Sequence, residues 1–371
     1  MTSSESLRLG PPEIAVPTLP GGVVLAGYYP PPLGGESVHI AELARRLRER
    51  GVGVEIVNVR RGAAPSAEYR SVSGALTLLG ALRQSLRHGA LLHLHTNGHS
   101  RRSWALVLAG AAALVAARAR GVLTLHSGFC PRYLEEREVF ERWIVRLVLA
   151  PFRHIVCVNE RIRASLAALG VRDERMSVMP AFLGVEEPGP LASSDAALIA
   201  RFDPCLVVAG ATAPEYGLDA LIDSIGMLAA RYPALGCVIM GAGDVRPLRA
   251  AVDRRGLTER VLCLGEVPHH RYLAFLAHAD VFIRPSIVDG DAISVREALA
   301  LGRPVVASDT DFRPDGVVTF RSGDAADLAS KVALALDEKT SSRGAVPHES
   351  HSFERLLGIY SAAVRARRER P

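Results

Sequence analysis

The stretch FIRPSIVDGDAISVREALALGRPVVAS, residues 282–308, contains an apolar run, a polar loop with a glycine, a helical pattern and a second apolar run. This order predicts a parallel strand–helix–strand unit. Asp289, Gly290 and Asp291 are then expected at a helix N-terminus, with Glu297 about a turn and a half into the helix. Free backbone N–H groups beside a carboxylate suit a nucleotide, because the N–H groups bind phosphate and the acid binds ribose hydroxyls.

Two simpler interpretations of this loop stay open. Asp291 is a typical N-cap residue, and its side chain would then only begin the helix. Asp289 and Asp291 also look like part of a metal site, but two loop carboxylates are too few ligands for a divalent cation. We therefore expect no metal at this position.

The alternation of strand and helix patterns extends outward from this unit and predicts an α/β fold with two Rossmann-like domains facing a cleft. In the first series, strands are expected over 22–27, 54–59, 91–95, 121–126 and 154–158, and helices over 39–50, 104–117 and 160–169. In the second, strands are expected over 205–209, 236–240, 261–264, 281–283 and 304–307, and helices over 217–231, 327–337 and 353–368.

A segment rich in Pro, Gly, Ser and acidic residues separates the two series, as an interdomain linker would. We expect a flexible N-terminal segment over 1–20, a first domain over 21–185, a linker over 186–200 and a second domain over 201–352. Open parallel sheets bind ligands at the carboxyl ends of their strands, so the cleft between these domains is the expected site.

Glycines follow two of the predicted strands at this edge. Gly34 and Gly35 precede the first helix, where they would let a phosphate approach its free N–H groups, although an ordinary turn explains them equally well. Gly241 and Gly243 follow a strand of the second series. Their sequence, IMGAGD, lacks the third glycine and the later acid of a dinucleotide fingerprint, so a nicotinamide cofactor is not expected.

Composition restricts the class of protein. The chain has 371 residues, of which 49% are hydrophobic and 22% charged, and this excludes a mostly disordered protein. Five cysteines without a CxxC spacing argue against a zinc site and a disulfide framework, and they favour the cytoplasm. The first twenty residues lack the pattern of a signal peptide, so export is not expected.

Positive charge is concentrated in the first half, where residues 1–190 hold 23 basic and 16 acidic residues. A basic face attracts anionic lipid, an anionic acceptor or nucleic acid by the same field, although a general preference for Arg explains the count more simply. Nucleic acid is not expected, because no basic motif with interleaved aromatics appears. The apolar run at 104–117 is too short to cross a bilayer and is either a core helix or an interfacial helix.

Several segments together resemble the family-4 glycosyltransferases of the GT-B fold, over residues 22–368. YYPPPLGGESVHIAELARRLRERGVGVEIV (28–57) is similar to the opening segment of that family, and LTLHSGF (123–129) to its TLHG segment. NERIRASLAALGVRDERMSVMPAF (159–182) is similar to the end of its first domain. VIMGAGDVRPLRAAVDRRGLTERVLCLGEVP (238–268) and residues 282–308 are similar to its nucleotide-sugar domain.

The resemblance implies a retaining, metal-independent transfer of a sugar from a nucleoside diphosphate sugar, most typically of UDP or GDP, to a hydroxyl group. It implies no cofactor, a sugar or lipid-linked acceptor, polysaccharide or glycoconjugate biosynthesis, and a terminal helix (353–371) that packs back on the first domain. Independently of the resemblance, the basic first half and the apolar run flanked by Arg101, Arg102, Arg118 and Arg120 predict a peripheral, salt-sensitive contact with the inner face of the membrane.

The resemblance also assigns residues. It gives catalytic roles to His126, Asp289 and Glu297, with Glu297 on the ribose and His126 beside the transferred sugar, although His126 would also serve as a polar cap on the sheet. His95 and His99 are expected to be loop residues. The donor-binding residues that it implies are Gly34, Gly35, Gly210, Gly241, Gly243, Arg284, Gly290, Asp291, Ala292 and Glu297.

This chain departs from the family pattern at its charged positions. The Glu-x7-Glu signature appears here as Asp289 and Glu297, and the Arg and Lys that usually face the donor diphosphate are replaced by Ala211 and Tyr216. Arg284 or Arg296 would have to supply the missing charge. Without it the chain would be an impaired, glycosyltransferase-like binding protein, and a nucleotide-sugar epimerase on the same fold is a further alternative.

Overall fold

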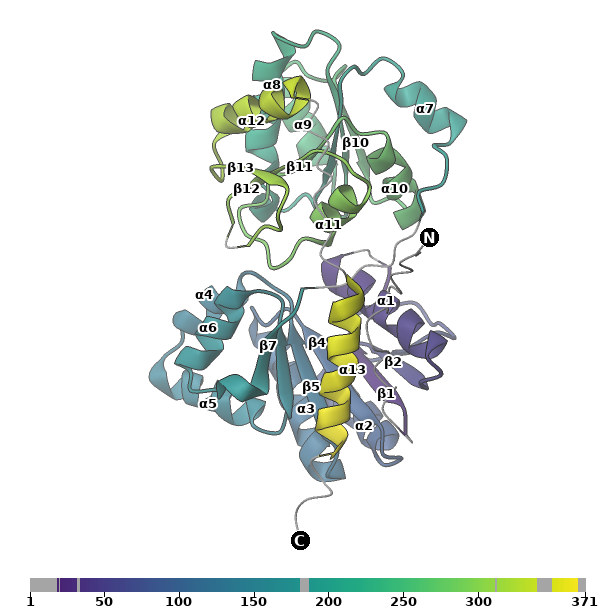
Figure 1. Cartoon of the computed structure of the whole chain (residues 1–371), viewed down its shortest axis with the longest axis vertical. Coiled ribbons are helices and arrows are strands. Elements are labelled where there is room, and N and C mark those ends of the chain that lie inside the picture. The colour runs from purple at the N-terminus through teal and green to yellow at the C-terminus, as the bar shows by residue number, and fades with distance from the viewer. Residues whose placement is uncertain are drawn as a thin grey trace, which may run out of the picture.

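The computed structural model describes residues 19, 21–31, 34–180, 187–310, 312–338 and 349–365. It contains a seven-stranded and a six-stranded sheet, one above the other in Figure 1, each with helices on both faces. All strand pairs in the two sheets are parallel. The predicted α/β architecture of two Rossmann-like domains is therefore confirmed.

The central strands β1, β4 and β5 of the first sheet are almost entirely buried, as expected for a parallel sheet covered on both faces. Their order across the sheet is β3-β2-β1-β4-β5-β6-β7. In chain order they are β1 (Val23–Gly27), β2 (Val54–Asn58), β3 (Arg70–Ser71), β4 (Leu91–Thr96), β5 (Arg120–Leu125), β6 (His154–Cys157) and β7 (Met176–Val178).

Two layers of helices cover this sheet. One layer contains α2 (Ala75–Leu86), α3 (Arg101–Ala117), α4 (Cys130–Glu135), α5 (Val139–Leu149) and α6 (Glu160–Ala168), whose apolar side chains share one core. The other contains α1 (Gly35–Glu49) and the terminal helix α13 (Glu349–Arg365). The apolar segment 104–117 is thus a helix that buries its inner face in the core, as the first of its two interpretations predicted.

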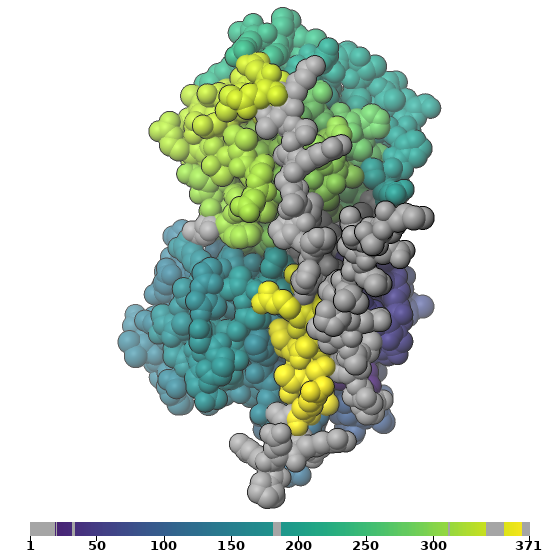
Figure 2. All heavy atoms as spheres, in the orientation of Figure 1, coloured from purple at the N-terminus to yellow at the C-terminus, as the bar shows by residue number. Residues whose placement is uncertain are grey.

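Helix α13 returns to the first domain although it ends the described chain (Figure 1). In Figure 2 its yellow atoms lie on the same lobe as the early, blue and purple part of the chain. Phe353 and Tyr360 are buried in the core that α1 and α13 share on this face of the sheet, and the Tyr360 hydroxyl lies 2.6 Å from Nδ1 of His93. The expected return of the terminal helix is present over 349–365, and residues 366–371 lie outside the described chain.

The second sheet has the order β10-β9-β8-β11-β12-β13. Its strands are β8 (Cys205–Ala209), β9 (Gly236–Met240), β10 (Val261–Gly265), β11 (Val281–Arg284), β12 (Val305–Ser308) and β13 (Val317–Phe320). Helices α8 (Leu218–Ala229), α9 (Arg246–Arg254) and α12 (Ala325–Asp337) pack on one face. Helices α10 (His269–Ala277) and α11 (Ile293–Ala300) pack on the other.

The periodicity of the sequence did not predict several elements, which are α2, α4, α5, α9, α10 and the edge strands β3, β7 and β13. Helix α1 begins four residues earlier than expected, because the Ser37 hydroxyl accepts the Gly34 N–H at 2.9 Å and closes the first turn. A short helix, α7 (Ser193–Ile199), lies inside the predicted linker. Asp195 on α7 pairs with Arg271 on α10, so this part of the linker is attached to the second domain. Of the segment 1–20, only Leu19 is described.

Candidate functional site

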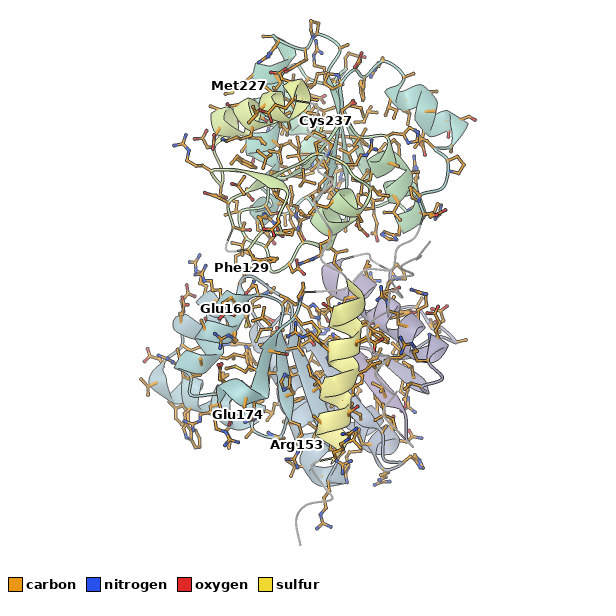
Figure 3. All side chains as sticks on the ribbon, viewed as in Figure 1. Phe129, Arg153, Glu160, Glu174, Met227 and Cys237 are labelled. Atoms are coloured by element: carbon orange, nitrogen blue, oxygen red, sulfur yellow. The ribbon has the colours of Figure 1, made fainter. Side chains whose placement is uncertain are left out.

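A cavity of about 390 Å³ lies where the two domains meet. Its walls are the carboxyl ends of β1, β4 and β5 from the first domain and of β8, β9 and β11 from the second. Figure 3 shows Phe129, one of its lining residues, at the margin of the first domain that faces the second. Parallel sheets place their loops together at this edge, which is why both series of loops reach one cavity.

The cavity brings together all the residues assigned from the sequence except Gly243. The first domain contributes Gly34, Gly35, Glu36, Val38, Asn97, His99, His126, Ser127, Gly128 and Phe129. The second contributes Ala209, Gly210, Glu215, Tyr216, Met240, Gly241, Ala242, Glu266, Val267, His269, Tyr272, Arg284, residues 288–294 and Glu297.

The loop between β11 and α11 touches the first domain directly. The Asn159 side-chain amide donates to the Gly290 carbonyl at 2.9 Å. A Cβ atom on Gly290 would lie 2.0 Å from the His126 carbonyl oxygen, and one on Gly128 would lie 2.2 Å from the carbonyl oxygen of Asp289. Both glycines are therefore needed for the close approach of the two domains at the cavity.

Asp289 forms ion pairs with two arginines. Nη2 of Arg284 donates to Oδ1 at 2.6 Å, and Nη1 of Arg313 donates to Oδ2 at 2.8 Å. Burial alone would raise the pKa of Asp289, but the two guanidinium groups lower it below its usual value. The carboxylate is therefore ionised and fully engaged, and the cluster carries one net positive charge.

Arg284 reaches the cavity from the last position of β11. Its Nη1 donates to the Ala209 carbonyl at 2.7 Å, and its guanidinium carbon lies 5.1 Å from the centroid of the Tyr216 ring. Arg284 therefore lies at the residue that replaces one of the expected cations. Arg296, the other candidate for that charge, is buried and paired with Asp291 at 2.9 Å, and it does not line the cavity.

Glu297 points into the cavity from the second turn of α11 and accepts a hydrogen bond from the His269 ring at 2.6 Å. His269 is the first residue of α10, 28 positions away in the sequence. Neither His269 nor Arg313 could be predicted from the sequence, because neither stands within a recognisable spacing of its partner.

The start of α1 forms the opposite wall. Gly34 and Gly35 leave open space for a ligand, with at most one atom at 4.0 Å from a Cβ built on either residue. Glu36 lies beside them and accepts the Tyr28 N–H at 2.9 Å. Burial raises the pKa of Glu36 to about 7, so this carboxyl group is partly protonated near neutral pH.

His126 lines the cavity and belongs to a cluster of histidines at the carboxyl ends of β4 and β5. Its Nε2 lies 3.1 Å from Nδ1 of His95, whose ring lies 4.0 Å from that of His93. Burial, and then the neighbouring rings, hold the pKa of all three well below the usual value, so they are neutral at pH 7. The expectation that His95 is a loop residue was wrong: it is buried in β4, because strand and loop polar residues look alike in sequence.

His99 does lie in a loop, where Nδ1 is 2.7 Å from the Ser127 hydroxyl and the ring lines the cavity.

The glycines of the second domain serve packing as well as access. Gly241 has φ +156°, and a Cβ there would lie 2.1 Å from the Gly210 carbonyl oxygen. Gly243 has φ +116° and packs on Thr212 outside the lining residues.

Among the described residues, no group of three or more His, Cys, Asp and Glu side chains is placed to hold a metal ion. The described residues also include no helix that is both long and apolar enough to cross a membrane. The five cysteines are buried and unpaired with one another.

Two family models match this chain. One is described as Glycosyltransferase Family 4 and matches residues 33–186; the other is described as Glycosyl transferases group 1 and matches residues 203–338. The two models thus cover the two sheets separately. Their boundary falls at the segment that contains α7.

Known proteins resemble the chain over most of its length. It is 27% identical over 390 residues to D-inositol 3-phosphate glycosyltransferase of Nocardia farcinica, covering 89% of this chain and 85% of the relative. It is 26% identical over 338 residues to phosphatidyl-myo-inositol mannosyltransferase of Mycobacterium leprae, covering 82% of this chain and 84% of that relative. The crystal structure of Anabaena HepE with UDP-glucose superposes with a TM-score of 0.71 at 17% identity, covering 93% of this chain and 99% of HepE.

Proposed function

Because the chain belongs to the family-4 glycosyltransferases of the GT-B fold, we propose that it transfers a sugar from a nucleoside diphosphate sugar to an acceptor hydroxyl. We propose further that the anomeric configuration is retained and that no metal ion is required. The main support is the interdomain cavity, which Arg284, the start of α1 and the loop before α11 line together. The neighbour Anabaena HepE has been solved with UDP-glucose, which agrees with a UDP-sugar donor.

In this proposal the diphosphate lies between the start of α1 and the loop that precedes α11. The backbone N–H groups of residues 290–292 and of Gly35 are the proposed donors, and Gly34, whose own N–H is bonded to Ser37, leaves room for the phosphate. Arg284 supplies the charge that the family obtains from the Arg and Lys absent here. A guanidinium binds two phosphate oxygens at once, and a charge-assisted bond of this kind contributes about 1.5 to 3 kcal/mol.

Glu297 binds the ribose hydroxyls in this arrangement. The His269 bond holds its carboxylate toward the cavity, and an ionised acid accepts from both hydroxyls of a ribose. His126 lies by the transferred sugar and, being neutral, acts as a hydrogen-bond partner for a sugar hydroxyl rather than as a cation.

The chemistry that these residues support is charge stabilisation and positioning. Asp289 is ionised and held by two arginines, so it orients Arg284 more readily than it would attack an anomeric carbon. The bond between the anomeric carbon and the diphosphate oxygen breaks while the acceptor oxygen bonds to that carbon on the same face. The departing phosphate takes the acceptor proton, and the positive charge of Arg284 stabilises the diphosphate that leaves.

A thermal-shift screen with UDP-, GDP- and ADP-sugars tests donor binding, because a ligand of the folded state raises the melting temperature. The expected result is a shift with one donor type that Arg284→Ala removes. Donor alone is then incubated and its products analysed: a new epimer would identify an epimerase, whereas acceptor-dependent release of nucleotide identifies the transferase. Absence of any shift would favour the impaired binding protein.

Metal independence has its own test. Activity is expected to be unchanged after treatment with a chelator, since Arg284 and backbone N–H groups supply the proposed contacts to the diphosphate. An absolute requirement for added Mg²⁺ or Mn²⁺ would overturn this part of the proposal. We also propose that the acceptor is a sugar or a lipid-linked sugar in polysaccharide or glycoconjugate biosynthesis, with peripheral contact between the basic first domain and the membrane.

A further inference from the structure

We propose that the outer surface of α2, α3 and α5 docks onto an anionic lipid bilayer. This surface, called the docking face below, carries the exposed apolar side chains Leu76, Leu108, Val115, Val139, Phe140, Trp143, Ile144 and Leu147. The proposal deepens the suggested membrane contact by giving it a surface and a binding mode, and it does not depend on the donor chemistry.

The apolar side chains of the described residues are unevenly distributed on the surface. Twelve large hydrophobic residues are exposed there, and eight of them lie on these three helices. Helix α5 alone carries five of them. The rings of Phe140 and Trp143 stack with their centroids 6.4 Å apart, and these side chains are 70% and 58% exposed. A folded monomer rarely exposes so many large apolar groups together, so the docking face is expected to meet a partner.

The three helices form one continuous layer. They pack on the same face of the first sheet and share one core, and α3 lies between α2 and α5. The outward residues of α3 between Arg101 and Arg118 are all Ala, Leu or Val. The exposed side of α3 therefore has no charge of its own, which links the apolar residues of α5 to those of α2.

Charge on and around the docking face is strongly positive. Residues 69–150, which include α2, α3, α4 and α5, contain eleven Arg and four Glu, and three of these acids, Glu135, Glu136 and Glu138, are exposed just before α5. Four of these arginines, on or beside α2 and α3, are exposed: Arg83, Arg87, Arg101 and Arg118. The acid Glu141 on α5 is only partly exposed and pairs with Arg137 at 3.5 Å. An apolar centre with tryptophan and a basic rim is the pattern of a surface that lies in the interface of an anionic membrane.

A second copy of this chain is the main alternative occupant. A twofold dimer places the same patch against itself, so two faces that each hold eleven Arg and four Glu over residues 69–150 would meet with like net charge. Anionic headgroups complement the same arginines. The charge distribution therefore favours a bilayer over self-association.

The position of the docking face is consistent with a membrane-bound acceptor. Helix α3 begins two residues after His99, and α4 begins directly after Phe129, both of which line the cavity. The docking face thus runs from the margin of the cavity along the outside of the first domain. An acceptor anchored in the bilayer would reach the cavity at this margin.

Sedimentation with vesicles tests the proposal on the full chain. The protein is expected to sediment with vesicles of phosphatidylcholine and phosphatidylglycerol at low salt, and much less with pure phosphatidylcholine or at high salt. The double variant Phe140→Ser/Trp143→Ser should lose at least about tenfold in partitioning, because two large apolar side chains no longer insert. The matched control is Met227→Ser, which changes a 52% exposed residue on α8 at the far end of the second domain (Figure 3) and should bind as the parent does.

Fluorescence gives a second readout. The chain has two tryptophans, Trp104 and Trp143, so the Trp104→Phe variant reports on Trp143 alone. We expect the emission of Trp143 to shift to the blue when anionic vesicles are added. If the protein sediments with the vesicles but this emission does not shift, the membrane contact lies elsewhere on the protein. Equal sedimentation of parent and double variant would overturn the proposal. The proposal would also be overturned if the parent were a dimer in solution and the double variant a monomer.

Donor-induced thermal shifts of the same variants separate this proposal from the proposed function. Because the docking face lies outside the cavity, the double variant should retain the thermal shift of the parent with the donor. Loss of vesicle binding with an unchanged shift supports the docking face. A parent that binds vesicles but shows no shift with any nucleotide sugar would refute the donor proposal and leave the docking face intact.

Discussion

The guanidinium carbon of Arg284 lies 5.1 Å from the centroid of the Tyr216 ring. Tyr216 stands where the family pattern has a Lys, so an aromatic ring replaces the cation and a cation from the adjacent strand lies against the ring. Asp289 holds the same guanidinium by two bonds, at 2.6 and 3.1 Å. Arg284 is therefore oriented from two sides before any ligand binds, which reduces the entropy lost when it binds a phosphate.

Arg284→Ala is expected to lower kcat/KM with a nucleotide sugar by about tenfold to a hundredfold, corresponding to one charge-assisted phosphate bond. Arg284→Lys should recover only part of this, because an ammonium cannot form two parallel bonds to a phosphate. Adding Tyr216→Lys to Arg284→Ala should restore part of the rate. Steady-state kinetics decide, with Arg246→Ala as the control, since Arg246 is exposed, pairs with Asp244 and does not line the cavity. Parental kinetics in Arg284→Ala would assign the missing charge to another residue.

Glu297→Ala is expected to weaken binding of the nucleotide by about tenfold to a hundredfold while the protein stays folded. The cause is loss of the acceptor for the ribose hydroxyls. Calorimetric titration with the nucleoside diphosphate measures this. His269→Ala is the comparison, because it removes the 2.6 Å pair and keeps the carboxylate, so it should cost less than Glu297→Ala. Equal losses in the two variants would mean that the pair matters and the ribose contact does not.

Gly290→Ala is expected to destabilise the protein by about 1 to 3 kcal/mol, because its Cβ would lie 2.0 Å from the His126 carbonyl oxygen. The interdomain contact must open to admit the methyl group, so kcat/KM should fall as well. Urea unfolding and kinetics measure the two effects. Gly226→Ala in α8 is the matched control: no atom lies within 4 Å of its Cβ, and alanine favours a helix. If Gly290→Ala behaved like the control, the close approach of the domains would not matter for activity.

Stability is expected to depend on pH through Glu36. Its pKa is raised to about 7 in the folded protein from 4.5 in the unfolded chain. The folded state therefore holds a proton that the unfolded chain has released, and the free energy of unfolding falls as the pH rises through this window. Glu36→Gln should be more stable than the parent near pH 8, by up to about 3 kcal/mol, and equal to it near pH 4. Urea unfolding of both proteins at the two pH values checks this. If the difference in the free energy of unfolding between variant and parent were the same at both pH values, the raised pKa of Glu36 would be contradicted.

The sequence alone predicted the α/β class, the two parallel sheets and most of the buried strands. Short continuous apolar runs such as residues 205–209 and 236–240 predict strands buried on both faces, and those assignments match β8 and β9 residue for residue. It also predicted which loops meet, because parallel strands all bring their carboxyl ends to one edge. For that reason Gly34, His126, Arg284 and Glu297 line one cavity although they span most of the chain.

The electrostatic partners were decided by tertiary structure. Arg313 and His269 reach Asp289 and Glu297 from other elements, and sequence separation gives no measure of such distances. His95 has the same polar side chain whether it ends in a loop or inside β4, and the pKa of Glu36 depends on burial that only the packed α1 produces. Periodicity reports the face of one element, whereas a pKa or an ion pair depends on which atoms from several elements surround a group. That is why the fold could be derived from the sequence and the charge balance of the cavity could not.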